Sequence, residues 1–163
     1  MARILIVGGG CLGRELAPRL IEQGHALRIT TRDEGHRPEI ESTGAECWIG
    51  TPDRLATLRG SLEGVTLACW MLARASGDPE QVRVLHGSRL ELFVRQIIDT
   101  PVRGLIYDAS PGVLPPGLLA GGVDIVRSLS ELNAIPLRVL AADADDQGWL
   151  AAAQEAVEDL LEA

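Results

Sequence analysis

Three glycines near the N-terminus have the spacing of a phosphate-binding turn. Gly8, Gly10 and Gly13 follow the apolar run at residues 3–7 and precede a helical pattern, which is the context that a G-x-G-x-x-G turn requires. The first glycine permits the tight bend, the second lets a pyrophosphate approach the backbone, and the third lets the helix pack closely on its strand. The pattern predicts a dinucleotide site, or else a turn that has kept its shape and lost its ligand.

The start of the helix after this turn would supply the phosphate contacts. The backbone amides of Gly10, Cys11 and Leu12 would point at the phosphates from the helix N-terminus. Cys11 has a second interpretation as a redox switch, because a helix N-terminus lowers the pKa of a thiol. This position of the turn usually holds a small residue with no special role, and we favour that simpler interpretation.

The end of the second strand bears on the choice of cofactor. An acidic side chain there would accept hydrogen bonds from the ribose hydroxyls of NAD. The position holds Thr31, and Arg32 follows it. A hydroxyl followed by a guanidinium suits the 2′-phosphate of NADP, because arginine pairs with phosphate in a bidentate manner. Asp33 and Glu34 leave NAD open, since either carboxylate could turn toward Arg32 or toward a ribose. The sequence therefore favours NADP over NAD.

Strand patterns and helix patterns alternate along the chain, and these elements must position the motifs. Together they predict a doubly wound Rossmann sheet of six parallel strands in the order 3-2-1-4-5-6, with helices on both faces, as one NAD(P)-binding domain over residues 1–163. The irregular stretch at 110–122 follows a central strand and should lie at the carboxyl edge of the sheet, where ligands bind. We expect strands at residues 3–7, 26–31, 46–49, 65–72, 104–108 and 136–141, and helices at 11–23, 38–43, 52–60, 79–99, 117–133 and 149–161.

The composition restricts the partners and the chemistry. A net charge of −8 argues against a nucleic-acid backbone as partner, and no apolar run approaches the roughly 18 residues that span a bilayer. Three scattered cysteines without C-x-x-C spacing argue against a zinc or redox site and favour a cytoplasmic location. All 15 basic residues are arginine, so no mechanism that needs a lysine is open to the chain. Asp143, Asp145 and Asp146 are expected to cap the last helix rather than to bind a metal.

Taken together, these motifs resemble the atypical short-chain dehydrogenase/reductase group, the branch of NAD(P)-binding proteins that includes sugar epimerase-like proteins. The resemblance covers most of the chain. Besides the glycine turn, the similar stretches are Gly24-His25, residues 50–53 with Leu55, residues 62–65 and residues 104–110.

The resemblance also implies catalytic residues that this chain lacks. In the family, a tyrosine on the fifth helix transfers a proton, and a lysine four residues later lowers the pKa of that tyrosine. The corresponding positions hold Leu119 and Val123, and the one tyrosine, Tyr107, lies on the fifth strand. Ser110 matches the strand-end serine of the family and is expected to contact the cofactor or to form a turn. No catalytic residue is assigned. Catalytic relatives also carry a further substrate-binding segment after the sixth strand, so the chain looks like a truncated member of the family.

Three functions from different classes fit these residues. The first is NADP(H) binding without catalysis, in a redox-sensing or regulatory module. The sequence favours it slightly, because residues 110–122 offer few polar groups to a substrate. The alternative is an NADPH-dependent oxidoreductase of flavin-reductase or quinone-reductase type, since direct hydride transfer needs mainly a cofactor and an acceptor stacked together. The third is a structural protein with an empty site, which the intact glycine turn disfavours.

The predicted helix at 79–99 carries more apolar side chains than contact with a sheet needs. They spread over most of its circumference, whereas covering a sheet takes a stripe of little more than 100°. Because similar dehydrogenases commonly pair their fourth and fifth helices across a twofold axis, we expect a homodimer through helices 79–99 and 117–133. Gly121 and Gly122 would allow close approach there, and His86 is expected to be a partly buried structural residue.

Overall fold

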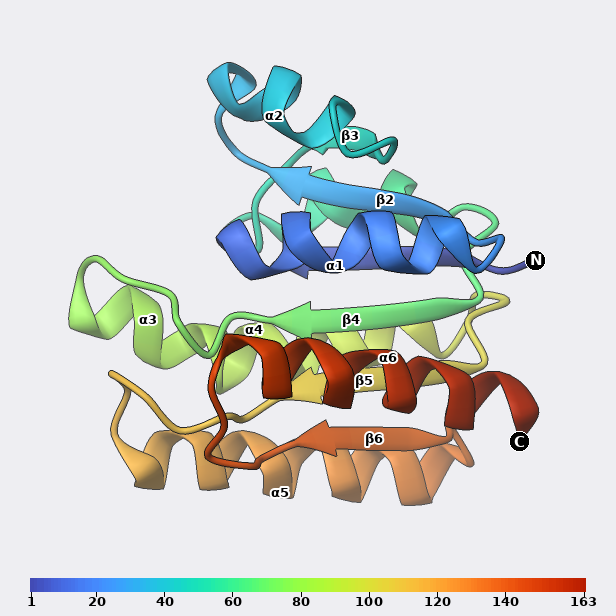
Figure 1. The fold of residues 1–163 in the computed structure, drawn as a ribbon. Coiled ribbons are helices and arrows are strands. Elements are labelled where there is room, and N and C mark those ends of the chain that lie inside the picture. The colour runs from blue at the N-terminus through green and yellow to red at the C-terminus, as the bar shows by residue number, and fades with distance from the viewer.

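The computed structural model describes all residues from 1 to 163 and contains one six-stranded parallel sheet between two layers of helices (Figure 1). The strand order is β3-β2-β1-β4-β5-β6, so the predicted topology is confirmed. The strands are β1 (Arg3–Gly8), β2 (Ala26–Thr31), β3 (Glu46–Ile49), β4 (Leu67–Met71), β5 (Gly104–Asp108) and β6 (Leu137–Leu140). The helices are α1 (Gly10–Glu22), α2 (Arg37–Glu41), α3 (Pro79–Leu85), α4 (Ser88–Ile97), α5 (Pro116–Asn133) and α6 (Asp146–Glu162), with 3-10 helices η1 (Glu34–His36) and η2 (Leu55–Leu62).

Two apolar cores lie on opposite faces of the sheet. Helices α1 and α6 pack side by side on one face, while η2, α4 and α5 cover the other (Figure 1). The central strand β4 is buried along its whole length, which explains its uninterrupted apolar sequence. Its alternate residues serve different cores: Cys69 faces α1 and α6, whereas Trp70 faces α4 and α5. None of the helices is long and apolar enough to cross a membrane.

The single long helix predicted at 79–99 is wrong, because the chain forms two helices there. Helix α3 ends before His86, and Gly87 has φ −127° and ψ −109°, outside the helical region, before α4 begins. The imidazole of His86 lies inside the protein, where Nδ1 is 2.6 Å from the hydroxyl of Tyr107 and Nε2 is 2.9 Å from the carbonyl oxygen of Leu72. These two contacts fix His86 at the break, and the residue is fully buried rather than partly buried.

Most of the apolar surplus on these two helices is buried inside the subunit. The side chains of Val82, Leu85, Leu90, Phe93, Val94 and Ile97 are all buried, and α4 packs against α5. Leu92 and Ile98 remain exposed. Gly122 does not serve an intersubunit contact, because it faces the buried ring of Tyr107 within the same subunit. The expected homodimer therefore loses much of its original basis.

The segment predicted as a helix at 52–60 also differs. Pro52 and Asp53 lie in a turn after β3, and the helical part is the 3-10 helix η2. The hydroxyl of Thr57 donates to the carbonyl oxygen of Arg54 at 2.6 Å and accepts from the amide of Thr51 at 2.8 Å. These local bonds hold the turn at the carboxyl edge of the sheet.

Candidate dinucleotide site

The glycine turn between β1 and α1 has a backbone that only glycine adopts readily. Gly8, Gly9 and Gly10 have φ angles of +83°, +85° and +54°, all in the left-handed region. A Cβ atom on Gly8 would lie 2.7 Å from the carbonyl oxygen of Met71, so the turn is packed tightly against β4. A Cβ atom on Gly10 would meet nothing within 4 Å. Gly10 therefore presents bare backbone to open space, as a phosphate would require.

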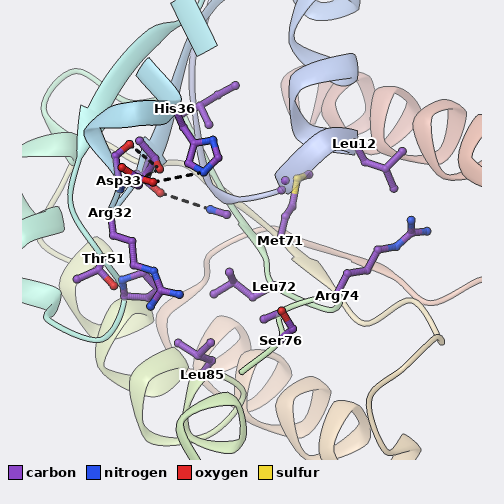
Figure 2. Close-up of a pocket in the computed structure, with 18 of the residues that line it drawn as sticks. Leu12, Arg32, Asp33, His36, Thr51, Met71, Leu72, Arg74, Ser76 and Leu85 are labelled. Atoms are coloured by element: carbon purple, nitrogen blue, oxygen red, sulfur yellow. Dashed lines mark hydrogen bonds and ion pairs between the residues drawn. The ribbon is translucent and has the colours of Figure 1, made fainter. Parts of the chain in front are cut away.

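The open space beside Gly10 is a cleft of about 700 Å³ along the carboxyl edge of β1, β2, β3 and β4. Six of the predicted site residues line it, namely Gly8, Gly10, Cys11, Leu12, Thr31 and Arg32. Figure 2 shows Arg32 and His36 toward one side of the cleft and Leu12, Met71 and Arg74 toward the other. The structure thus brings the glycine turn and the end of β2 into one site.

Two predicted site residues do not line this cleft. Gly13 lies in the first turn of α1, where a Cβ atom would be 3.6 Å from both the Gly8 carbonyl oxygen and the Ile6 side chain, which agrees with its expected packing role. Ser110 is buried after β5, where its hydroxyl donates to the carboxylate of Asp108 at 2.6 Å. Ser110 therefore forms the turn that was one of its two expected roles, and this turn holds Asp108.

At the end of β2, the two acidic residues that left NAD open are engaged locally. Asp33 accepts from the amide of Gly35 at 2.8 Å and so caps η1, and Glu34 pairs with Arg37. The hydroxyl of Thr31 accepts from the amide of Asp33 at 3.2 Å. Neither carboxylate forms an ion pair with Arg32, and Asp33 lines the cleft.

The guanidinium of Arg32 is 72% exposed and stands 3.6 Å from the carboxylate of Asp53. A pair at this distance and exposure is weak. The Arg32 side chain can therefore turn into the cleft at little cost.

The cleft also gathers cations that the sequence did not single out. Arg14 and Arg74 line it together with Arg32, and the carboxylates of Asp33, Asp53 and Asp108 line it as well. Arg14 is 3.3 Å from Glu39, and Arg74 is 3.2 Å from Asp146. Arg74 comes three residues after the end of β4, so its position directly after a buried strand was the available signal. Such a group of cations suits a ligand with several phosphate charges.

Cys11 lies at the exposed start of α1, where a guanidinium nitrogen of Arg14 is 3.4 Å from its sulfur. The other two thiols, of Cys47 and Cys69, are buried. Burial raises the pKa of Cys47 above its ordinary value and raises the pKa of Cys69 to about 12. Cys11 is thus the thiol that reagents in solution reach, and it lies in the cleft.

Asp108, the last residue of β5, and Trp149, in the first turn of α6, line the end of the cleft nearest β5, which we call its inner end. Both residues are buried, with 3% and 4% of their surface exposed. Asp108 was not singled out from the sequence, although it ends a predicted strand, and Trp149 was assigned to an apolar helical stripe. The prediction that Trp149 belongs to the apolar, core-facing side of the last helix is confirmed, because Trp149 packs in the core formed with α1 and α6.

The only tyrosine is unsuited to proton transfer in the cleft. The Tyr107 hydroxyl is buried between His86 and Gly122, and Tyr107 does not line the cleft. Burial raises the pKa of Tyr107, and the nearby Asp108 carboxylate raises it further. Burial also lowers the pKa of His86, which favours a neutral imidazole that accepts from Tyr107 at Nδ1 and donates to Leu72 from Nε2. This pair is a structural link between β4, β5 and the α3–α4 break.

Neither a family model nor a curated protein sequence matches the chain. Solved structures do match its fold. A UDP-glucose 4-epimerase from Thermotoga maritima has 14% identity and a TM-score of 0.71, with 85% of this chain and 54% of that chain covered. A UDP-glucuronic acid 4-epimerase from Bacillus cereus, solved with NAD, has 11% identity, a TM-score of 0.66 and coverages of 85% and 55%. Vestitone reductase from alfalfa has 15% identity, a TM-score of 0.61 and coverages of 86% and 56%.

The chain has a Rossmann fold. It spans about half the length of these similar structures. In a Rossmann fold the crevice forms where the strand order reverses, which here is between β1 and β4. The cleft of this chain lies at that position, with the glycine turn at its centre.

Proposed function

We propose that the chain binds NADP(H) in this cleft and acts as a redox-sensing or regulatory module. In this proposal it is a member of the epimerase-like short-chain dehydrogenase/reductase group. The observation that carries the proposal is the left-handed glycine turn whose Gly10 opens into a cleft lined by three arginines. Amides at the start of α1 would bind the pyrophosphate. The similarity to an epimerase solved with NAD supports a nicotinamide dinucleotide as the ligand.

The preference for NADP over NAD rests on the end of β2. A carboxylate that accepts from ribose hydroxyls would favour NAD. Asp33 uses Oδ1 to cap η1, and its Oδ2 stands 3.7 Å from His36, so a ribose would compete with these two partners. Arg32 is exposed beside the cleft, and His36 lines the cleft near it. An arginine that leaves a weak partner for a phosphate gains a stronger, charge-assisted pair of hydrogen bonds.

The preference for binding over catalysis rests on the absence of a proton-transfer group of the family type. The chain contains no lysine, and its tyrosine hydroxyl is buried away from the cleft. Leu119 and Val123 line a small apolar pocket of about 280 Å³ beside α5, where no side chain can exchange a proton. A module that only senses NADP(H) needs none of these groups.

Replacing Arg32 by alanine tests the cofactor assignment. We expect the NADPH dissociation constant to rise by about tenfold to 100-fold, because a hydrogen-bonded charge pair contributes about 1.5–3 kcal/mol. NADH, which lacks the 2′-phosphate, should bind equally to both proteins. Isothermal titration calorimetry measures both affinities.

The matched control is Arg37→Ala, since Arg37 is near Arg32 in sequence but pairs with Glu34 and does not line the cleft. This variant should bind NADPH like the wild type. An equal loss of NADPH and NADH affinity in Arg32→Ala would show that Arg32 has no role in selecting the 2′-phosphate. Adding flavin or quinone acceptors to the NADPH complex tests the alternative function, because a binding module leaves NADPH unconsumed.

We also propose that the protein is a homodimer through α4 and α5. The remaining support is the exposed apolar surface of Leu92 and Ile98 next to α5, together with Leu132 on α5 itself. Light scattering at micromolar concentration should give twice the 17.4 kDa mass of the chain. A monodisperse species at the mass of one chain would contradict the dimer.

A further inference from the structure

Trp149 has a buried hydrogen-bond donor without a partner. The indole lines the inner end of the cleft, and its Nε1 atom is buried with no acceptor in the protein. The other two tryptophans are satisfied: Trp48 donates to Thr57 at 2.8 Å and Trp70 donates to Leu85 at 3.0 Å, in both cases to the backbone carbonyl oxygen. Because an unpaired buried N–H group is costly, Trp149 points to an acceptor that comes from a ligand.

Asp108 supplies the complementary group at the same end of the cleft. Its two hydrogen bonds, from the amide of Ser110 at 3.0 Å and the hydroxyl of Ser110 at 2.6 Å, both end on Oδ1. No arginine or histidine forms an ion pair with this carboxylate, which is only 3% exposed. Its Oδ2 atom is therefore available to a donor or to a positive charge in the cleft.

The direction of the dinucleotide leads one end of it to these residues. The proposed function puts the 2′-phosphate at the end of β2 and the pyrophosphate at the glycine turn. The two halves of a dinucleotide lie on either side of the switch point. The rest of the ligand must therefore continue across β4 toward β5. Leu12 and Met71, both largely buried, form apolar walls on this path (Figure 2). Asp108, at the end of β5, and Trp149, at the start of α6, line the same cleft on the β5 side.

We propose that the inner end of the cleft binds the nicotinamide ring, with the Trp149 N–H donating to the carboxamide oxygen and the Asp108 carboxylate accepting from the carboxamide nitrogen. This inference rests on the proposed function. A carboxamide carries one acceptor and one donor group, which is the complement of an unpaired indole N–H and a free carboxylate oxygen. The carboxylate also favours the oxidised cofactor, because the nicotinamide ring carries its positive charge only in that form.

The test compares two ligands that differ only in the nicotinamide. NADP⁺ and 2′-phospho-ADP-ribose are titrated calorimetrically into the wild type and Trp149→Phe, which removes the N–H and keeps an aromatic ring. We expect the variant to bind NADP⁺ about fivefold more weakly, as loss of one hydrogen bond predicts, and to bind 2′-phospho-ADP-ribose unchanged. Trp48→Phe is the matched control, because Trp48 does not line the cleft, and it should leave both affinities unchanged.

A second variant keeps the proposal testable if Trp149→Phe does not fold. Asp108→Asn preserves the size of the side chain and removes its charge, so NADP⁺ binding should weaken by about tenfold and NADPH binding by clearly less. In Trp149→Phe the oxidised and reduced forms should weaken alike, because the carboxamide is the same in both.

NADP⁺ affinity that is unchanged in both variants would overturn the nicotinamide assignment while dinucleotide binding stands. So would a variant that loses affinity for 2′-phospho-ADP-ribose as much as for NADP⁺. A wild type that binds neither ligand would instead reject the proposed function, and the nicotinamide assignment with it.

Discussion

Gly122→Ala is expected to lower the free energy of unfolding by about 3 kcal/mol, at the upper end of the usual range for overpacking a core. The new Cβ atom would lie 2.6 Å from Cζ of Tyr107 and closer still to its hydroxyl oxygen. The ring cannot move aside easily, because it is fully buried and its hydroxyl is hydrogen-bonded to His86 at 2.6 Å. Urea unfolding followed by circular dichroism measures the loss as a lower midpoint.

The neighbouring residue provides the control. Gly121 lies in the same helix, is exposed, and would meet nothing within 4 Å if it carried a Cβ atom. Gly121→Ala should therefore stabilise the protein by up to about 1 kcal/mol, because alanine is the better helix former. Opposite signs at two adjacent glycines cannot arise from helix propensity alone. Equal stability of Gly122→Ala and Gly121→Ala would mean that Tyr107 does not occupy the space beside α5.

This contact also marks the limit of what the sequence predicts about the fold. The apolar runs of β1, β4 and β5 could be recognised as buried strands, and general rules of chain connection then fix the sheet order. The sequence does carry a local sign of the break between α3 and α4, because His86-Gly87-Ser88 interrupts the apolar pattern. The contacts that hold His86 at the break could not be found in the sequence, because Leu72 and Tyr107 lie 14 and 21 residues away along the chain.

The residues of the candidate site also differ in how well the sequence predicts them. The glycine turn and the Thr31–Arg32 pair were predictable, because their chemistry depends on neighbours in sequence. Asp108 and Trp149 were not singled out, because they join the cleft only when the end of β5 and the start of α6 come together, whereas Arg74 carried a signal in its position after a buried strand. Ser110 forms the turn that was one of its two expected roles, and this turn holds the carboxylate of Asp108 in place.

Gly10→Asn is expected to abolish NADPH binding while leaving the protein folded, and it has the largest effect on the proposed function. Asparagine tolerates the left-handed backbone that Gly10 adopts at φ +54° better than other side chains. Since a Cβ atom at this position meets no protein atom within 4 Å, the added side chain would occupy the cleft rather than disturb the turn. A side chain in the space of the pyrophosphate should weaken NADPH by at least about 100-fold, or about 2.7 kcal/mol.

Gly24→Asn is the matched control, because Gly24 also has a positive φ of +95° and open space, but it follows α1 at the opposite edge of the sheet. It should bind NADPH like the wild type. Maleimide labelling of Cys11 gives a second measurement, since Cys11 is the exposed thiol and lines the cleft, whereas the other two are buried. NADPH should slow the labelling of the wild type and of Gly24→Asn, but not of Gly10→Asn. Pyrophosphate binding at the glycine turn depends on the bare backbone of Gly10. If folded Gly10→Asn bound NADPH as tightly as the wild type, the pyrophosphate would therefore lie away from the glycine turn.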